Sequence, residues 1–241
     1  MSTPRDFVLV HGAWHGAWCW KRILPALWAA GHRAFAVSLS GVGERAHLGP
    51  AGITLDTHIQ DVAAVIEAEE LQQCILVGHS YAGMVITGVA DRLHERIGQL
   101  VYLDAVVPWP GDAWSSRHSD ETRTQRRALI AAQGVLPAAP PSLFGLADDD
   151  AAWVERRQTP HPGGVYDQPL PYDADRWARL PRRFIDCTAP ALATIAASRE
   201  RVRREPGWIV DEIATGHDAM ISAPLALLDC LLAAAGDRPG T

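Results

Sequence analysis

The chain contains 241 residues, of which 48% are hydrophobic and 21% are charged, and its formal net charge is −6 at pH 7. This size and composition are typical of a globular protein with a sizeable hydrophobic core. The negative charge argues against nucleic acid and anionic membrane surfaces as partners. No apolar run reaches the roughly 18 residues of a membrane-spanning helix, so we expect no membrane span.

The cysteines are scattered and lack the paired spacing of a zinc site or a disulfide framework. They stand at Cys19, Cys74, Cys187 and Cys230. We expect them to be buried thiols in a reducing compartment, and we expect no metal site. The first residues run into a strand without the basic segment, apolar stretch and cleavage site of a secretory leader. These features together predict a cytoplasmic protein.

The first apolar run, at residues 7–10, ends in a segment of small and polar residues, 11–16. A continuous apolar run is typical of a strand in a parallel sheet that is covered on both faces. In an acyl-transfer enzyme, the turn after such a strand supplies one donor of the oxyanion hole. The amide of Ala13 is the candidate donor, and an ordinary strand-to-helix turn is the alternative interpretation.

A second apolar run, at residues 74–77, leads into the segment GHSYAG and then directly into a helical pattern. A serine between a strand and a helix, with small residues around it, is the expected context of a nucleophile elbow. Such a turn exposes the hydroxyl of Ser80 and directs the amide of Tyr81 at the same point. The fifth position of the motif is Ala82, with Gly83 one residue later, so an ordinary Gly/Ser turn is the alternative.

Two further strand ends carry candidate catalytic side chains. The strand at residues 100–103 ends in Asp104, and the strand at residues 208–213 is followed by a loop that contains His217. Alternating strands and helices predict a mostly parallel sheet with helices on both faces and active residues at the carboxyl ends of its strands. A serine nucleophile needs a neutral imidazole within hydrogen-bond reach, and His217 comes last in the chain, as in the order Ser, acid, His.

Residues 108–180 interrupt this alternation and are rich in proline, tryptophan and charge. The segment is too long for a plain loop in a compact domain. We predict a cap inserted over the carboxyl edge of the sheet, with residues 1–107 and 181–241 forming the core of one structural domain. The cap and Trp14 are expected to line an apolar substrate pocket, and an ordinary surface excursion is the alternative.

Several segments together carry a resemblance to a known family. They are residues 7–16 (FVLVHGAWHG), 41–48 (GVGERAHL), 55–59 (LDTHI), 78–83 (GHSYAG) and 216–220 (GHDAM). The chain resembles the α/β-hydrolases of the plant methylesterase and hydroxynitrile lyase branch, and most closely the bacterial esterases of that branch. The resemblance implies an α/β-hydrolase fold, Ser80 as nucleophile, His217 as base, and the amides of Ala13 and Tyr81 as the oxyanion hole. It also implies that no cofactor is needed and that members are often homodimers.

The triad acid departs from the pattern of this family. Relatives commonly carry an aspartate in a segment of the type Cys-Thr-x-Asp-Pro-Ala-Leu, whereas residues 187–192 here read CTAPAL. Asp104 and Asp186 are the two available substitutes for orienting the imidazole. We favour Asp104, because Asp186 lies within a predicted strand and its side chain is expected to point away from the histidine. A triad without an acid is the third alternative.

The sequence therefore predicts a serine carboxylic ester hydrolase that acts through an acyl-enzyme on a small apolar or aromatic ester. One alternative is a lyase or cyclase in which the Ser/His pair is a general base, and another is a ligand-binding protein that has lost turnover. The lyases of the branch tend to carry an acidic residue before the serine and a lysine after the histidine. Here these positions hold His79 and Asp218, which argues against cyanohydrin cleavage.

Overall fold

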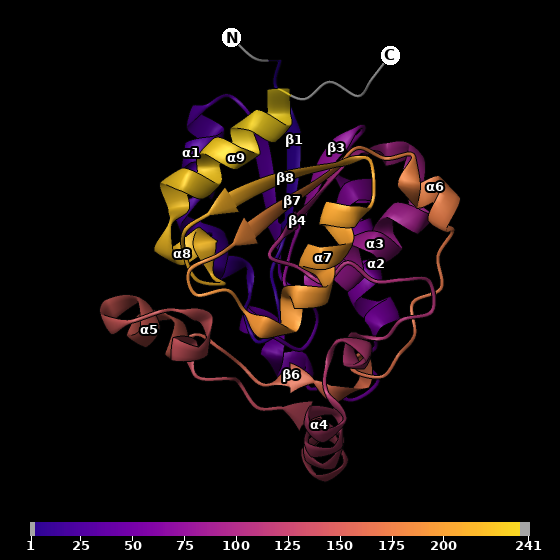
Figure 1. Ribbon diagram of the computed structural model, residues 1–241, viewed down its shortest axis with the longest axis vertical. Helices are drawn as coiled ribbons and strands as arrows, with labels where there is room; N and C mark the ends of the chain where they lie inside the picture. The colour runs from indigo at the N-terminus through magenta and orange to yellow at the C-terminus, as the bar shows by residue number, and fades with distance from the viewer. Residues whose placement is uncertain (1–2, 237–241) are drawn as a thin grey trace.

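A single parallel sheet organises the chain in a computed structural model that describes residues 3–236 (Figure 1). The order of its six strands is β2-β1-β3-β4-β7-β8, and all neighbouring strands are parallel. The strands are β1 (Asp6–Val10), β2 (Arg33–Val37), β3 (Cys74–His79), β4 (Ile97–Leu103), β7 (Arg182–Cys187) and β8 (Trp208–Ile213). The predicted mostly parallel α/β sheet is confirmed.

Helices cover both faces of the sheet (Figure 1). One face carries α1 (Leu24–Ala29), α8 (Ala219–Ser222) and α9 (Pro224–Gly236), and the other carries α2 (Leu55–Ala68), α3 (Ala82–Arg92), α6 (Ala174–Ala178) and α7 (Ala196–Arg204). Strand residues alternate between the two layers: Phe7 and Leu9 pack with α1 and α9, whereas Val8 and Val10 pack with α2 and α3. Both sets are apolar because both faces are covered, which explains the continuous apolar runs of the sequence.

The chain between β1 and β2 forms two short helical pieces. They are a 3-10 segment, Ala17–Arg22, and α1. Pro25 stands in the first turn of α1, where a missing amide is tolerated but continuation of an earlier helix is not. The helix α7 begins at Ala196, since Leu192 has extended backbone, and the carbonyl of Leu192 accepts a hydrogen bond from Arg199.

Residues 108–180, which we call the cap segment, connect β4 to β7. They contain α4 (Asp120–Gln133), β5 (Val135–Leu136), α5 (Asp148–Glu155), β6 (His161–Pro162) and α6, and β5 pairs with β6 in an antiparallel ribbon. In Figure 1, α4, α5 and β6 lie at the end of the molecule toward which the carboxyl ends of the parallel strands point. The division of the chain into a core and a cap stays a prediction.

The described part of the chain contains no helix that is long and apolar enough to cross a membrane. The four cysteines are free, and Cys19, Cys74 and Cys187 are buried, as expected. The expectation is wrong for Cys230, which lies on α9 and is only half-buried. Burial raises the pKa of the Cys74 thiol to about 12 and the pKa of the Cys187 thiol well above its usual range, so these side chains are hydrophobic packing groups.

The close packing of the elbow helix depends on glycine at position 83. A Cβ atom built on Gly83 would lie 1.9 Å from the carbonyl oxygen of Val106, which is a backbone atom and cannot rotate away. The backbone amide of Val106 in turn donates to the carbonyl of Ser80 over 3.0 Å, so this contact holds the elbow against the strand that follows it. The glycine that the motif needs is therefore Gly83, and alanine at position 82 is tolerated.

We expect Gly83→Ala to lower the free energy of unfolding by about 3 kcal/mol, since the added methyl group forces the elbow away from Val106. Chemical denaturation followed by circular dichroism measures this change. Gly236→Ala is the matched control, because a Cβ atom there meets no atom within 4 Å, and it should be neutral or slightly stabilising. Equal stabilities of the two variants would contradict this account of the elbow.

Candidate active site

Three residues with strained backbone gather at the carboxyl ends of neighbouring strands. Trp14 follows β1 with φ 67°, Ser80 follows β3 with φ 56°, and Asp104 follows β4 with φ 38°. Residues other than glycine rarely adopt this left-handed backbone conformation, because it costs roughly 1–3 kcal/mol for each residue. Residues with such strain concentrate at functional sites. The adjacent order of β1, β3 and β4 in the sheet brings these three strand ends together.

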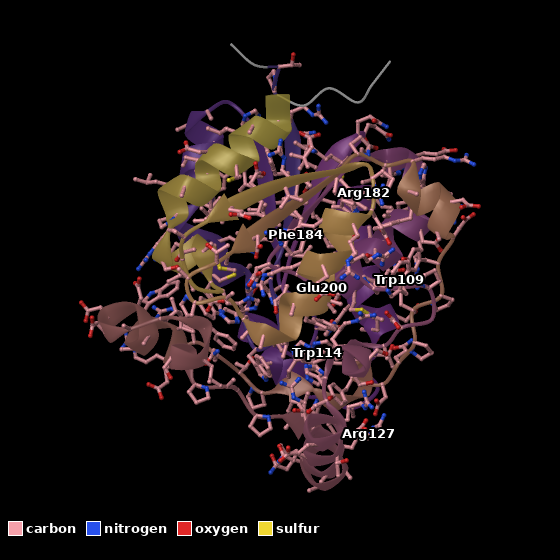
Figure 2. The ribbon with its side chains drawn as sticks, viewed as in Figure 1. Trp109, Trp114, Arg127, Arg182, Phe184 and Glu200 are labelled. Atoms are coloured by element: carbon pink, nitrogen blue, oxygen red, sulfur yellow. The ribbon has the colours of Figure 1, made fainter. Side chains whose placement is uncertain are left out.

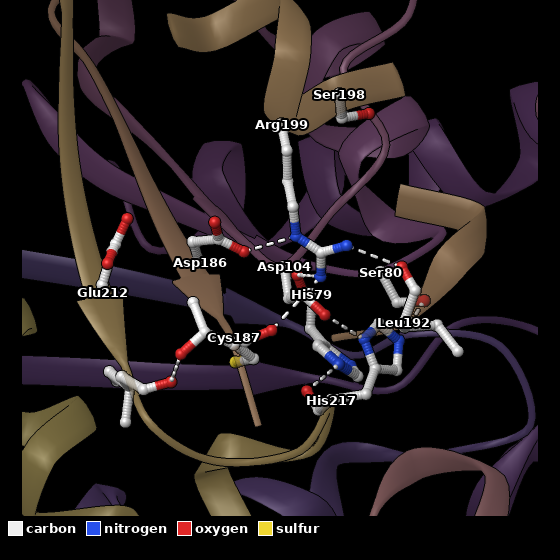
Figure 3. Close-up of polar contacts among 12 residues, drawn as sticks. His79, Ser80, Asp104, Asp186, Cys187, Leu192, Ser198, Arg199, Glu212 and His217 are labelled. Atoms are coloured by element: carbon white, nitrogen blue, oxygen red, sulfur yellow. Dashed lines mark hydrogen bonds and ion pairs between the residues drawn. The ribbon is translucent and has the colours of Figure 1, made fainter. Parts of the chain in front are cut away.

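His217, on the loop after β8, lies between Ser80 and Asp104 (Figure 3). Its Nε2 atom lies 2.8 Å from the Ser80 hydroxyl, and its Nδ1 atom lies 2.6 Å from Oδ2 of Asp104. Asp104 is fully buried and His217 nearly so. A carboxylate only accepts hydrogen bonds, so Nδ1 carries the proton and Nε2 accepts from the serine. The structure thus brings together the serine, the histidine and the aspartate that the sequence analysis favoured.

Asp186 does not reach His217 and instead pairs with two arginines of α7. Its carboxylate accepts from Nε of Arg199, and Arg203 donates to its other oxygen over 2.6 Å. Arg199 also donates to Oδ1 of Asp104 over 2.6 Å, so one guanidinium connects both carboxylates. Burial opposes the charge on Arg199, but Asp104 and Asp186 outweigh it and raise the pKa of that side chain. Arg199 has no signal in the sequence, since only the fold brings it to Asp104.

The loop that carries His217 is fixed through its backbone from two directions. The His217 amide donates to the carbonyl of Phe144 in the cap segment over 2.9 Å. Its carbonyl accepts from Nε2 of His79, which precedes the nucleophile, over 3.1 Å. Burial and the neighbouring His217 hold the pKa of His79 well below its usual range, so His79 is a neutral donor in a single tautomer. His79, the residue before Ser80 in the elbow motif, therefore helps to hold the loop of His217 in position.

A second histidine–aspartate pair, which is buried, contacts the loop after β1 that contains Ala13 and Trp14, here called the oxyanion loop. His15 donates from Nδ1 to the carbonyl of Ala13 over 2.8 Å and from Nε2 to Asp218 over 3.3 Å. Burial alone would raise the pKa of Asp218, but the charge of His15 and its hydrogen bond outweigh it and lower that pKa to about 2. Burial likewise opposes the charge on His15, and Asp218 outweighs it and raises the pKa of the imidazole. The pair is a buried ion pair that orients the Ala13 carbonyl.

The backbone amides of Ala13 and Tyr81 are the sequence-predicted oxyanion donors. Within residues 3–236, neither amide donates a hydrogen bond to a protein acceptor. By contrast, the next amide in the oxyanion loop, that of Trp14, donates to Nδ1 of His161, and the carbonyl of Trp14 accepts from the amide of Thr159. Both of these partners belong to the cap segment, which therefore holds the strained Trp14 in place.

A cavity of about 160 Å³ opens onto the Ser80 hydroxyl. Its apolar lining consists of Trp14, Val106, Trp114, Ala139, Leu143, Phe144, Leu192 and Ile195, and its remaining lining residues are Ser80, Arg117, His118, Arg126, Thr194 and His217. An apolar cavity of about 150 Å³ is large enough to hold a benzene ring. A larger hollow, of about 400 Å³, lies between α2, α3 and residues 168–171, and its lining contains no serine, cysteine or histidine.

One group of side chains among residues 3–236 lies close enough to share a metal ion, namely His79, His217 and Asp218. Both ring nitrogens of His217 are already engaged by Ser80 and Asp104, and Nε2 of His79 donates to a carbonyl. These atoms would have to give up the hydrogen bonds of the triad in order to bind a metal, so the group does not fit a metal site.

Residues 7–229 match the model of the alpha/beta hydrolase family. The protein belongs to this family. A carbendazim-hydrolysing esterase from Nocardioides sp. (strain SG-4G) is 41% identical over 238 residues, which cover 95% of this chain and 98% of that one. Among solved structures, an extracellular α/β-hydrolase from a Paenibacillus species superposes with a TM-score of 0.83 at 21% identity, covering 97% of this chain and 100% of that chain. The methylesterase MES16 from Arabidopsis superposes with a TM-score of 0.76 at 23% identity, covering 95% and 98%.

These relatives confirm three sequence predictions for this alpha/beta hydrolase: the fold, the branch of the family, and its assignment to the esterases. The two solved structures establish the fold alone, because their identity to this chain is low.

The buried His15–Asp218 pair predicts a pH dependence of stability. Folding lowers the pKa of Asp218 from 3.8 to about 2, so its contribution is present above pH 3.8 and is lost as the pH falls toward 2. The loss is on the order of 2 kcal/mol, at about 1.4 kcal/mol per pKa unit. Folding raises the pKa of His15, so its contribution is present below its ordinary pKa of 6.5 and is lost as the pH rises through the folded value.

Urea denaturation of the wild type and Asp218→Asn at a series of pH values measures this effect. The free energy of unfolding of the wild type should exceed that of the variant near neutral pH, and this difference should disappear at acidic and at alkaline pH. The free energy of unfolding of the variant should depend less on pH. Asp149→Asn, at an exposed position in the first turn of α5, should keep the wild-type profile. Parallel profiles for the wild type and Asp218→Asn would contradict the assignment of an ion pair.

Proposed function

We propose that this alpha/beta hydrolase is a serine carboxylic ester hydrolase that cleaves small esters with an apolar or aromatic part through an acyl-enzyme. The observation that carries the proposal is the continuous chain from the Ser80 hydroxyl through His217 to Asp104, with separations of 2.8 and 2.6 Å. Such a chain activates an otherwise weak nucleophile, because the imidazole accepts the serine proton as the bond to the carbonyl carbon forms.

In the first half of the reaction, the Ser80 oxygen attacks the ester carbonyl and its proton passes to Nε2 of His217. The imidazolium that forms is stabilised by the carboxylate of Asp104, which lies against its Nδ1–H. The amides of Ala13 and Tyr81 donate to the developing oxyanion, and their lack of a protein acceptor supports this role. Collapse of the tetrahedral intermediate expels the alcohol, which takes the proton from His217.

In the second half, water attacks the acyl-enzyme. His217 accepts a proton from the water, the same two amides bind the new oxyanion, and the proton returns to Ser80 as the carboxylic acid leaves. No cofactor takes part in either half, since the proton is shuttled within the triad.

The size of the cavity supports a small substrate with one ring or a short chain next to the reacting carbonyl. The 41% identical relative is named for the hydrolysis of carbendazim, so carbendazim is a proposed test substrate alongside aryl and methyl esters. The lyases of this branch tend to carry a lysine after the histidine. Here the residue after His217 is Asp218, a buried aspartate paired with His15, which argues against cyanohydrin cleavage. The cytoplasmic location and the homodimer stay predictions.

We expect a fluorophosphonate probe to label the wild type at Ser80, as detected by mass spectrometry of the tryptic peptides. Ser80→Ala should remain unlabelled and should lose roughly 10⁵-fold or more in kcat on an aryl ester, since its nucleophile is gone. Ser116→Ala, which removes a hydroxyl bonded to the Ala113 amide and not in contact with the triad, is the control and should keep both signals. A wild type that is neither labelled nor active on any ester would refute the proposal.

The two candidate acids can be separated by the matched substitutions Asp104→Asn and Asp186→Asn. The first should lower kcat by about 10⁴-fold, because an amide facing Nδ1 favours the wrong tautomer of His217. The second removes a partner of Arg199 and Arg203 and should lower kcat by less than about tenfold. Steady-state kinetics on one aryl ester, with circular dichroism to check folding, gives the answer. A larger loss in Asp186→Asn would overturn the choice of Asp104.

A further inference from the structure

The helix α4 places a single cationic side chain at the wall of the catalytic cavity. None of its residues is buried, and most of them face solvent. Arg123 and Arg126 are both half-buried, but of the arginines of this helix only Arg126 lines the same cavity as Ser80 and His217. Figure 2 shows Trp114 between the sheet and α4, and Arg127 on α4 away from the sheet.

Three aromatic rings surround the guanidinium of Arg126. Its central carbon lies 5.8 Å from the ring centroid of Trp14, 5.3 Å from that of Trp114 and 5.7 Å from that of Tyr166. These are cation–π distances, and together the rings fix the position of the planar group. Two of the three rings, Trp14 and Trp114, line the cavity themselves.

The polar partner of Arg126 is neutral. Its terminal nitrogen donates to Nε2 of His118 over 3.1 Å, so the other ring nitrogen of His118 carries the proton and faces the Tyr166 hydroxyl at 3.3 Å. Burial and the nearby Arg126 and Arg123 hold the pKa of His118 at about 3, so this imidazole carries no charge at neutral pH. It accepts only one of the five N–H donors of the guanidinium.

Neighbouring arginines have the counter-ion that Arg126 lacks. On the same helix, Arg123 pairs with Asp120 and Arg127 pairs with Asp167, and in the cavity wall Arg117 pairs with Asp112. Among residues 3–236, Arg126 makes no ion pair. Burial lowers the pKa of Arg126, as expected for a cation in an apolar setting. A partly buried charge of this kind is ordinarily paired, and the open side of this one is the cavity that holds the nucleophile.

We infer that Arg126 is a subsite for a carboxylate carried by the non-reacting part of the ester, so that the preferred substrates are half-esters of small dicarboxylic acids. A carboxylate matches the planar, forked donor set of a guanidinium. The carboxylate supplies the missing counter-ion, while the apolar lining of the cavity holds the ring or short chain that joins it to the reacting carbonyl. This inference rests on the proposed esterase function and specifies the substrate of the same site.

The test compares esters that differ only in this charge. Monomethyl isophthalate and dimethyl isophthalate share the ring and the scissile methyl ester, and monomethyl terephthalate and monomethyl adipate vary the spacing between the two groups. For at least one of the half-esters, wild-type kcat/KM should exceed that of its dimethyl ester by roughly 10- to 100-fold. This is the factor expected when a hydrogen bond to a charged group stabilises the complex. Arg126→Met keeps the length of the side chain and should reduce this ratio to about one or below.

Arg127→Met is the matched control, because it removes the same charge from the next position of α4 at an exposed site paired with Asp167. It should retain the wild-type ratio. If neutral esters are cleaved and no half-ester is preferred, or if both variants lower the ratio equally, the subsite is refuted and the esterase function stands. Failure of the esterase proposal gives a different result: the wild type is not labelled by the phosphonate and turns over no ester.

A binding measurement tests the subsite without turnover. Benzoate should bind the wild type in isothermal titration calorimetry and should bind Arg126→Met at least about tenfold more weakly, whereas Arg127→Met should match the wild type. Circular dichroism checks that the variants are folded. Equal affinity of benzoate for the wild type and Arg126→Met, or no binding to either, would overturn the inference even if no ester is hydrolysed.

Discussion

The buried carboxylate of Asp104 is the interaction on which the site depends. One oxygen accepts from His217 and the other from Arg199, each over 2.6 Å, and the side chain has no contact with solvent. A charge in such a place is tolerated only when it is paired and hydrogen-bonded. The carboxylate therefore ties together the end of β4, the loop after β8 and the helix α7, and these three elements cannot move independently without exposing an unpaired ion.

The strain at the site is supported by contacts from the cap segment. Trp14 keeps its left-handed backbone while its amide donates to His161 and its indole donates to the carbonyl of Leu136 over 3.0 Å. The His217 amide donates to Phe144 of the same segment. Residues of the cap segment thus fix the backbone on either side of the proposed triad, and two of the residues in these contacts, Trp14 and Phe144, also line the cavity at Ser80.

The sequence predicted the sheet, the elbow and the histidine because each has a local signature: a continuous apolar run, a small-residue turn between strand and helix, and a position after the last strand. It also ranked Asp104 above Asp186 correctly for proximity to His217, since the side chains of a strand alternate and Asp186 points toward α7. Arg199 and the ion pair of His15 had no such signature. Their partners are 95 and 203 residues away, and only the folded chain brings them together.

The most direct test of the account is the proton that Asp104 holds on Nδ1 of His217. Proton NMR of the free enzyme labelled with 15N-histidine should detect the Nδ1 proton of His217 as a strongly deshielded resonance. This resonance should be present in the wild type and in Asp186→Asn. The same resonance should be absent from Asp104→Asn, while the rest of the spectrum shows a folded protein. A resonance that survives in Asp104→Asn and disappears in Asp186→Asn would contradict the central claim that Asp104 is the acid behind the histidine.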